Sequence, residues 1–286
     1  MYNLTAPSQV KALLDTHGFH TKKSLGQNFL IDRNIRDRIV DAAGLTADSN
    51  VLEVGPGIGT LTLALSEAAR QVAAVEIDDR LLPILRETTG DRANITIIHD
   101  DILKTDIAEI AADVFGGAPF TLVANLPYYI TSPVIMRFLE EDLPVAGMVV
   151  MVQKEVAQRL TASPGTKEWG ALSAAAQLYA DISMPFSVPP TVFYPQPQVA
   201  SGVVRLDTKK VTLSPAVKDA FFTLMRVGFA QRRKTLLNTL SAAFPNGDKA
   251  SVRKACAMTG IDPGARAEAL TIDQWMSLAE ALLSLS

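Results

Sequence analysis

The sequence predicts an α/β fold built on a largely parallel sheet, followed by a small all-helical domain at the C-terminal end. Short runs rich in Val and Ile alternate with helical stretches between about residues 32 and 207, which is typical of parallel strands joined by helical crossovers. No strand pattern follows Lys210, and this predicts the helical domain. We therefore expect two domains, 1–207 and 208–286.

The elements of the first domain follow from local patterns taken in chain order. Asp32 is the expected N-cap of a helix that stops at Gly44, since apolar residues recur on one face between them. A further helix is expected at 61–69, directly after the first strand. The buried strands, rich in β-branched residues, are expected at 51–54, 72–77, 95–98, 120–124 and 145–152.

The end of the first domain and the helices after it have their own sequence patterns. Five prolines between residues 185 and 197 rule out a regular helix there. Ser214 is placed to cap a helix that has Pro215 at its first position. Thr271, with Gln274 three residues later, forms a capping-box pattern for the last helix.

The composition excludes several classes of protein. Hydrophobic residues make up 48% of the chain, enough for a sizeable core, and the formal net charge is −3, so nucleic-acid binding must rest on local basic clusters. The single cysteine, Cys256, and three scattered histidines suggest neither a disulfide nor a metal site. No signal-peptide pattern and no long apolar run are found, so we expect a cytoplasmic protein.

A glycine-rich turn at 55–59 follows the first strand and opens a helix. Its G-x-G-x-G spacing lets the backbone pass close to a ligand and differs from the G-x-G-x-x-G of dinucleotide-binding proteins. Glu76 and Asp101 come at the next two strand ends, placed to accept hydrogen bonds from ribose hydroxyls and an adenine amino group. The turn alone leaves NAD or another nucleotide open, whereas the two acids favour S-adenosylmethionine. Asp100 could exchange roles with Asp101.

After the fourth strand come Asn125, Leu126, Pro127 and Tyr128. Adenine N6 carries two N–H donors, which the Asn125 side-chain oxygen and the Leu126 carbonyl are suited to accept. Pro127 fixes the backbone, and Tyr128 offers a flat face for an extruded base. Because a sulfonium methyl donor is already activated, catalysis needs positioning more than a strong base. The alternative is an ordinary strand-to-turn segment with packed tyrosines.

These motifs, taken in order, resemble the ribosomal RNA adenine N6-dimethyltransferases over roughly residues 20 to 240. Besides the glycine turn and the two acids, the matching runs are TKKSLGQNFL at 21–30, NLPYY at 125–129, VQKEVAQRL at 152–160, FYPQPQVAS at 193–201 and FAQRRK at 229–234. The Gly-Gln-Asn form of the first run resembles bacterial members. One residue departs from the pattern, since Ala200 stands where the family usually has Asp.

The resemblance implies a Rossmann-like class I methyltransferase sheet of seven strands with a helical C-terminal domain. It implies that S-adenosyl-L-methionine is used to dimethylate N6 of two adjacent adenosines in the 3′-terminal hairpin of 16S ribosomal RNA, during small-subunit maturation. The candidate cofactor-binding residues are Gln27, Asn28, Leu30, Gly55, Gly57, Glu76, Asp101 and Asn125. The candidate catalytic residues are Asn125, Leu126, Pro127, Tyr128 and Phe193, the last as a second stacking partner for the base.

The basic run Arg232, Arg233 and Lys234 is the predicted RNA contact. A net-acidic protein binds RNA if one face collects its cations. The expected partner is 16S ribosomal RNA within the small ribosomal subunit, with no membrane, and the chain is expected to be a monomer.

Three other functions stay open. The first is the related class of enzyme that methylates an adenine in large-subunit RNA. The second is an assembly factor without turnover, against which the intact Asn125 and glycines argue. The third is a small-molecule or DNA adenine methyltransferase, which shares the Asn-Leu-Pro-Tyr run but not the other motifs.

Overall fold

The computed structural model describes residues 2–22, 25–231, 233–241 and 249–285. Contacts divide the chain into two compact units. We call Met1–Ala157 with Asp181–Thr208 the sheet unit, and Gln158–Ala180 with Lys209–Ser286 the helical unit. No helix in these described ranges is long and apolar enough to cross a membrane.

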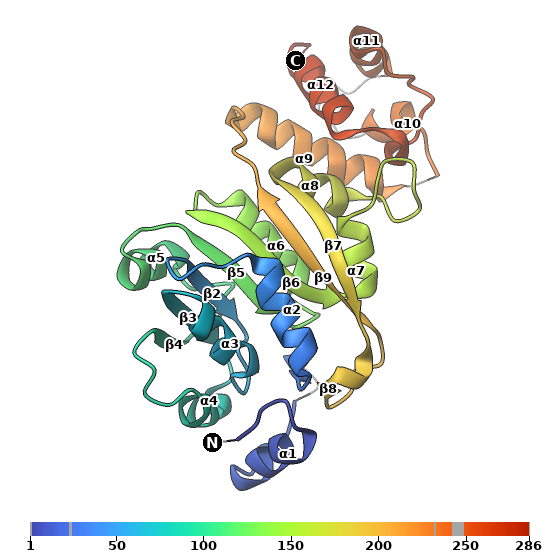
Figure 1. Cartoon of the computed structure of the whole chain (residues 1–286). Coiled ribbons are helices and arrows are strands. Elements are labelled where there is room, and N and C mark those ends of the chain that lie inside the picture. The colour runs from blue at the N-terminus through green and yellow to red at the C-terminus, as the bar shows by residue number, and fades with distance from the viewer. Residues whose placement is uncertain (1, 23–24, 232, 242–248, 286) are drawn as a thin grey trace. The chain divides into compact units, whose positions relative to one another are not determined.

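Within the described residues, seven strands form the main sheet in the order β4-β3-β2-β5-β6-β9-β7 (Figure 1). The five strands from β4 to β6 are parallel, and β9 runs antiparallel to β6. This confirms the predicted α/β class. The strands are β2 (Asn50–Val54), β3 (Gln71–Glu76), β4 (Ile95–His99), β5 (Phe120–Asn125), β6 (Val145–Gln153), β7 (Ala180–Val188) and β9 (Ser201–Thr208).

A separate two-stranded sheet joins β1 (Phe29–Leu30) to β8 (Phe193–Tyr194) in antiparallel fashion. It connects a segment near the start of the chain to one that precedes β9. The sequence patterns indicated neither strand, because each is only two residues long. This pairing brings the run at 21–30 to the run at 193–201.

Helices α2 (Arg33–Ala43) and α3 (Thr60–Ala68) pack on one face of the main sheet, where Ile39 and Leu65 are fully buried. The predicted start and stop of α2 are confirmed: Asp32 accepts a hydrogen bond from the Ile35 N–H at 2.9 Å, and Gly44 is left-handed. The other helices of this unit are α1 (Pro7–Thr16), α4 (Leu82–Thr89), α5 (Ile107–Phe115) and α6 (Thr131–Glu140), and α7 (Lys154–Leu160) begins in it and ends in the helical unit.

The helical unit has its own apolar core, in which Trp169, Phe221 and Trp275 are almost fully buried. Its helices are α8 (Ala171–Tyr179), α9 (Pro215–Ala230), α10 (Leu236–Leu240), α11 (Lys249–Thr259) and α12 (Ile272–Leu283). The capping box of Thr271 and Gln274 is present. Residues 158–180 precede the predicted boundary at 207, yet they pack in this unit because Trp169 joins its core.

Candidate functional site

The glycine-rich turn lies between β2 and α3, at the carboxyl edge of the main sheet. Gly55, Gly57 and Gly59 have φ values of 67°, 59° and 88°. A Cβ on Gly57 would lie 3.0 Å from the Phe29 ring, and one on Gly59 would lie 2.9 Å from Thr88 Oγ1. The turn therefore needs glycine both for its backbone conformation and for the close packing around it.

A cavity of about 1160 Å³, its open mouth included, lies over this turn. The segment 25–30, the turn and the residues that follow β3, β4 and β5 line it. Carboxyl ends of parallel strands meet at one edge of a sheet, and this brings together residues far apart in the sequence. The predicted site residues that line the cavity are Gln27, Asn28, Leu30, Gly55, Gly57, Glu76, Asp101, Asn125, Leu126, Pro127 and Tyr128.

Glu76 ends β3 and is 4% exposed. Its Oε2 accepts a hydrogen bond from the Gly57 N–H at 3.1 Å, and its Oε1 accepts one from the Asp78 N–H at 2.9 Å. Burial raises the pKa of Glu76, although these hydrogen bonds partly oppose that effect. A carboxylate has about four acceptor positions, so Glu76 can still accept a hydrogen bond from a ligand hydroxyl.

Glu53 is a second buried carboxyl group at this edge, and sequence reasoning gave it no role. It is 1% exposed and lines the cavity. Burial, with a contribution from the charge of Glu76, raises the pKa of Glu53 to about 8, so the group is mainly protonated at neutral pH. No described residue forms a hydrogen bond with its Oε2. Its place just before the glycine turn was the available indication.

Asp100 and Asp101 follow β4 and both line the cavity. Asp101 Oδ1 accepts a hydrogen bond from the Leu103 N–H at 3.0 Å, and its Oδ2 lies 3.4 Å from Lys104 Nζ. Asp100 is the more exposed of the two, and its Oδ1 accepts the Asp101 N–H at 2.7 Å. Asp101 is therefore the more sheltered acceptor.

Asn125 is the last residue of β5, and its Nδ2 donates to the Asn28 carbonyl at 3.1 Å. Within the described residues, no hydrogen bond is formed to the Asn125 side-chain oxygen or to the Leu126 carbonyl. The Pro127 carbonyl is engaged differently, since it accepts the Ile130 N–H at 3.2 Å beside the start of α6. Two unengaged acceptors thus belong to one cavity wall.

Tyr128 is held by an interaction that sequence reasoning missed. Its hydroxyl lies 3.0 Å from the hydroxyl oxygen of Ser201, a fully buried residue at the start of β9. Ser201 closes the matching run at 193–201, and that was the available indication. Ala200, the departure from the family pattern, uses its carbonyl to accept the Lys154 N–H at 2.9 Å. Any residue at position 200 makes this main-chain hydrogen bond.

Phe193 is the predicted catalytic residue that the cavity lining does not include. It is 3% exposed and packs in the core, where β8 pairs it with Leu30. Its role as a second stacking partner stays a prediction. Tyr129, by contrast, lines the cavity and is 52% exposed.

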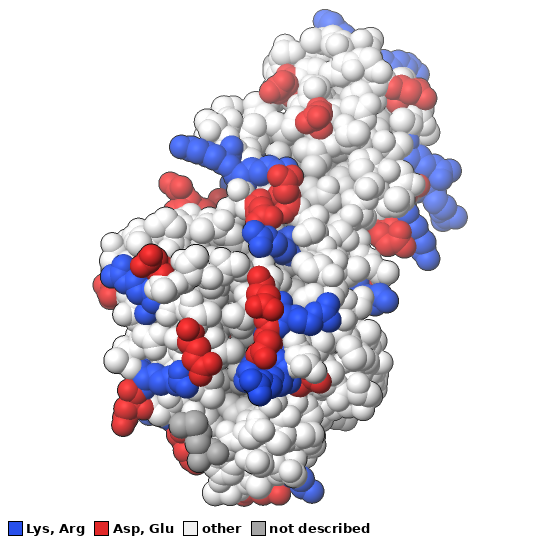
Figure 2. Space-filling view, in the orientation of Figure 1, with Lys and Arg blue, Asp and Glu red and all other residues white. Residues whose placement is uncertain are grey.

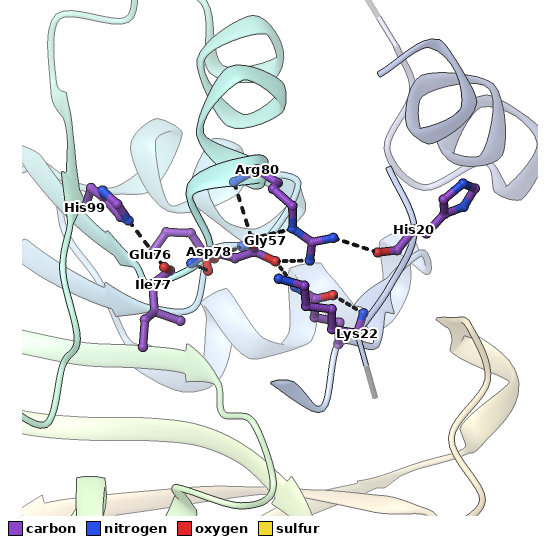
Figure 3. A network of polar contacts seen from close by, with 9 residues as sticks. His20, Lys22, Gly57, Glu76, Ile77, Asp78, Arg80 and His99 are labelled. Carbon is purple, nitrogen blue, oxygen red and sulfur yellow. Dashed lines mark hydrogen bonds and ion pairs between the residues drawn. The ribbon is translucent and has the colours of Figure 1, made fainter. Parts of the chain in front are cut away.

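The segment before β1 is held by a polar network (Figure 3). Gln27 Nε2 donates to Asp78 Oδ2 at 2.7 Å, and Gln27 Oε1 accepts the Lys22 N–H at 2.7 Å. Asn28 Nδ2 donates to the Gly26 carbonyl at 2.9 Å and closes the turn. Both ends of the Gln27 amide are therefore used within the protein, although the residue lines the cavity.

The predicted RNA-contact residues lie in the helical unit, after α9. Arg233 and Lys234 are exposed, whereas Arg232 lies outside the described residues. On the face of the sheet unit that Figure 2 shows, acidic and basic side chains are intermixed, without one large patch of a single sign. Among the described residues, no group of His, Cys, Asp and Glu side chains is suited to hold a metal ion.

The cavity fits an adenosine-containing cofactor. The glycine turn brings backbone without side chains of its own to the cavity lining, and Glu76 and Asp101 provide acceptors at two neighbouring strand ends. Ile77 and Leu103 are 45% and 37% exposed and line the same cavity, which suits a flat apolar ring. These observations agree with a cofactor such as S-adenosylmethionine.

Comparison with known proteins identifies the family. The sequence profile of the ribosomal RNA adenine dimethylases, "Ribosomal RNA adenine dimethylase", matches residues 18–283. The chain is 49% identical to "Ribosomal RNA small subunit methyltransferase A" of Geobacillus thermodenitrificans, over 99% of this chain and 98% of the relative. The protein of the same name from Alkaliphilus metalliredigens is 47% identical over 98% of each chain.

Two solved structures resemble the fold. One is a dimethyladenosine transferase from Plasmodium falciparum, with a TM-score of 0.72 and 25% identity over 87% of this chain and 95% of the other. The other is the 23S rRNA methyltransferase ErmE, with a TM-score of 0.69 and 30% identity over 89% of this chain and 99% of the other. Family profile, relatives and fold agree. The chain therefore belongs to the ribosomal RNA adenine dimethylase family, RNA adenine N6,N6-dimethyltransferases with a class I methyltransferase fold.

Proposed function

We propose that this chain uses S-adenosyl-L-methionine to dimethylate N6 of two adjacent adenosines in the 3′-terminal hairpin of 16S ribosomal RNA, as a step of small-subunit maturation. The observation that carries the proposal is a single cavity wall on which two unengaged acceptors, Asn125 and Leu126, adjoin a glycine turn and an acidic strand end. The acceptors suit adenine N6, and the turn and acid suit the cofactor.

The cofactor would be held by groups at three strand ends. Glu76 would accept the ribose hydroxyls, Asp101 would accept the adenine amino group, and Gly55 and Gly57 would let the backbone approach the ligand. Ile77 and Leu103 would contact the adenine ring. Bound S-adenosyl-L-methionine would supply a methyl group that its positive sulfur has already activated. Asn28 and Leu30 complete the wall, while Gln27 supports it through Asp78.

The RNA side of the reaction is a matter of positioning. The Asn125 oxygen and the Leu126 carbonyl accept the two N–H groups of adenine N6 and keep its lone pair turned to the methyl donor. Tyr128, anchored through Ser201, presents a fixed ring on which the extruded base stacks. Neither acceptor is basic enough to keep the proton that N6 loses, so that proton passes to solvent at the open mouth.

The second methyl transfer makes a different demand. After the first transfer, N6 keeps one N–H, so one acceptor is left without a donor. Stacking on Tyr128 must then contribute more of the positioning. We expect Tyr128→Ala to raise the ratio of monomethyladenosine to dimethyladenosine as well as to slow the reaction. Phe193→Ala tests whether a core aromatic residue has the same effect, and an unchanged ratio would remove Phe193 from the catalytic set.

The nearest alternative is methylation of large-subunit RNA, because ErmE shares the fold at 30% identity. Two observations favour the small subunit. The relatives named for the small subunit are 47% to 49% identical over nearly the whole chain, including the helical unit. The Gly-Gln-Asn sequence at 26–28, which resembles that of bacterial members, also lines the cavity.

The test is methyl transfer from labelled S-adenosyl-L-methionine to purified small and large subunits of a methylation-deficient bacterial strain. Mass spectrometry of the nucleosides should show N6,N6-dimethyladenosine at two neighbouring positions of 16S RNA. Product confined to 23S RNA, or only monomethyladenosine from the unaltered protein, would contradict the proposal. The Asn125→Ala variant serves as the inactive control.

The proposed substrate also implies how the chain binds RNA and in what oligomeric state it acts. We infer that the RNA is bound within the small ribosomal subunit, that Arg232, Arg233 and Lys234 contact its phosphates, and that the chain acts as a monomer. A ribosomal substrate places the enzyme in the bacterial cytoplasm. Sedimentation of the free chain and of its mixture with small subunits measures both the oligomeric state and the complex.

A further inference from the structure

The described residues 19–22 and 25–28, which we call the strap, form one wall of the cavity through their second half. The strap has no regular strand, so side-chain contacts must fix its position. At one end Phe19 packs in an apolar cluster with Phe29, and the polar side-chain contacts meet at one buried carboxylate, that of Asp78, which is 4% exposed (Figure 3).

Asp78 holds the strap from two directions. Its Oδ2 accepts Gln27 Nε2 at 2.7 Å and Arg80 Nη2 at 2.5 Å, and its Oδ1 accepts Arg80 Nε at 2.8 Å. Arg80 then reaches the strap itself, because Nη1 donates to the His20 carbonyl at 3.1 Å and its guanidinium lies 4.8 Å from the Phe19 ring centre. Burial alone would raise the pKa of Asp78, but hydrogen bonds from Arg80 and Gln27 hold it below its usual value.

The same network touches both halves of the proposed site. The Asp78 N–H donates to Glu76 Oε1 at 2.9 Å, on the cofactor side. The Asn28 carbonyl, at the end of the strap, accepts Asn125 Nδ2 at 3.1 Å, on the base side. One continuous set of hydrogen bonds and strap backbone therefore runs from the ribose acceptor to the adenine acceptor.

The hydrogen bond between Asn28 and Asn125 determines which side of the Asn125 amide can face adenine N6. An amide turned by 180° would present N–H donors to N6, which is itself a donor, and no hydrogen bond could form between them. The Asn28 carbonyl accepts only from the Nδ2 side, so it keeps the Asn125 oxygen turned the other way. A displaced strap would remove that constraint.

We propose that Asp78, with Gln27 and Arg80, is a positioning group that holds the strap in place and thereby fixes the orientation of the Asn125 amide for methyl transfer. The inference rests on the proposed function, since it assumes that Asn125 accepts from N6. It assigns Asp78 and Arg80, which are not candidate site residues from the sequence, and it gives Gln27 a supporting role in place of a direct cofactor contact.

The experiment exchanges the donor and the acceptor of one hydrogen bond. Gln27→Glu places a second carboxylate against Asp78 and should release the strap. Asp78→Asn in the same chain removes the repulsion between the two carboxylates, and the new amide at position 78 can donate to the new carboxylate at position 27. Arg80 Nη2 then loses the Asp78 Oδ2 acceptor that it has in the unaltered chain. We expect Gln27→Glu to lower kcat at saturating cofactor by at least about tenfold, on the scale of one hydrogen bond to a charged group. The double variant should recover part of that activity.

Asp79→Asn is the matched control. It removes the same charge one position away, from an exposed side chain, and should leave kcat unchanged. Gln27→Ala, which removes the hydrogen bond without adding charge, replaces Gln27→Glu if the latter does not fold in a thermal melt. Folded Gln27 variants with unaltered kcat, or a double variant no better than Gln27→Glu, would overturn the proposal.

A calorimetric titration with S-adenosylhomocysteine separates this inference from the proposed function. If the unaltered chain transfers no methyl group to small subunits, the proposed function fails. The strap interaction is then still tested by the affinity for S-adenosylhomocysteine. Gln27→Glu should weaken this affinity, and the double variant with Asp78→Asn should recover part of it. Equal affinities for all three chains would overturn the strap proposal by itself.

Discussion

The sheet unit and the described part of the helical unit differ in the charged groups that they bury. The sheet unit buries three carboxyl groups at one edge, those of Glu53, Glu76 and Asp78. In the described part of the helical unit, the buried polar side chains are Ser173 and Thr239, neither of them charged. Burying a carboxylate costs stability unless it is neutralised or paired. The sheet unit bears this cost where a ligand is proposed to bind.

The units also differ in net charge. The sequence gives the helical unit 13 Lys and Arg against 7 Asp and Glu, whereas the sheet unit has 14 against 23. The whole-chain charge of −3 is therefore the sum of two unlike parts. A basic unit attracts RNA phosphate even when the complete protein is acidic. Chemistry and electrostatic docking are thus expected to depend on different units, and the following predictions test that separation.

The largest expected effect concerns Asn125 in the sheet unit. Asn125→Ala should lower turnover by more than about 100-fold, the scale of losing one positioned partner of the transition state. Binding to small subunits should stay as before, because the helical unit is unaltered. Single-turnover methyl transfer and subunit binding are measured on the same preparation. If the variant turns over at nearly the rate of the unaltered chain, Asn125 is not the acceptor for adenine N6.

Glu76→Ala should weaken S-adenosylmethionine binding by about 1–3 kcal/mol, the cost of losing hydrogen bonds to a charged acceptor. Calorimetry of the free protein measures this directly. Glu76→Gln keeps one acceptor oxygen and places its NH2 group against either the Gly57 or the Asp78 N–H, so its affinity should lie between those of the Ala variant and the unaltered chain. An unchanged affinity in the Ala variant would remove Glu76 from the cofactor site.

Glu53 should give the sheet unit a stability that depends on pH. The folded-state pKa of about 8 lies above the ordinary 4.5, so the folded protein retains a proton that the unfolded chain releases between these values. The free energy of unfolding should therefore fall as the pH rises from about 5 to 8, by at most about 1.4 kcal/mol per pH unit. Glu53→Gln removes this contribution.

Urea unfolding of Glu53→Gln and the unaltered chain at several pH values provides the test. The difference in stability between the two should shift in favour of the Gln variant toward pH 8. Parallel curves for the two proteins would mean that Glu53 titrates normally in the folded state.

The smallest effect is expected in the helical unit. Replacing Arg232, Arg233 and Lys234 with Ala should reduce the salt dependence of small-subunit binding by up to about 0.7–0.9 in logarithmic slope for each RNA phosphate that is no longer neutralised. Cofactor affinity should not change, because Arg233 and Lys234 are outside the cavity lining. Identical salt slopes would make the cluster ordinary surface and would weaken the division of roles between the units.

The sequence by itself determined the class of fold and most of the candidate site. Strands β2, β3, β5 and β6 were predictable because parallel strands buried on both faces read as continuous apolar runs. The edge strand β4 is partly exposed, so the expectation that it is buried was wrong, but its Ile-rich run still marked it as a strand. The glycine turn, Glu76, Asp101 and Asn125 were predictable as candidates because each lies at or just after the end of a strand, and strand ends meet at one sheet edge. Helix caps at Asp32, Ser214 and Thr271 were local patterns, and all three were confirmed.

Tertiary structure decided what depends on contacts between distant segments. Ser201 anchors Tyr128, and Asp78 holds Gln27, across 73 and 51 positions of sequence. Trp169 draws residues 158–180 into the helical unit, and Phe193 is taken into the core by pairing with Leu30. The protonation of Glu53 follows from complete burial, which no local pattern specifies. Local sequence sets backbone geometry and periodicity, whereas burial and side-chain partners exist only after the chain has folded.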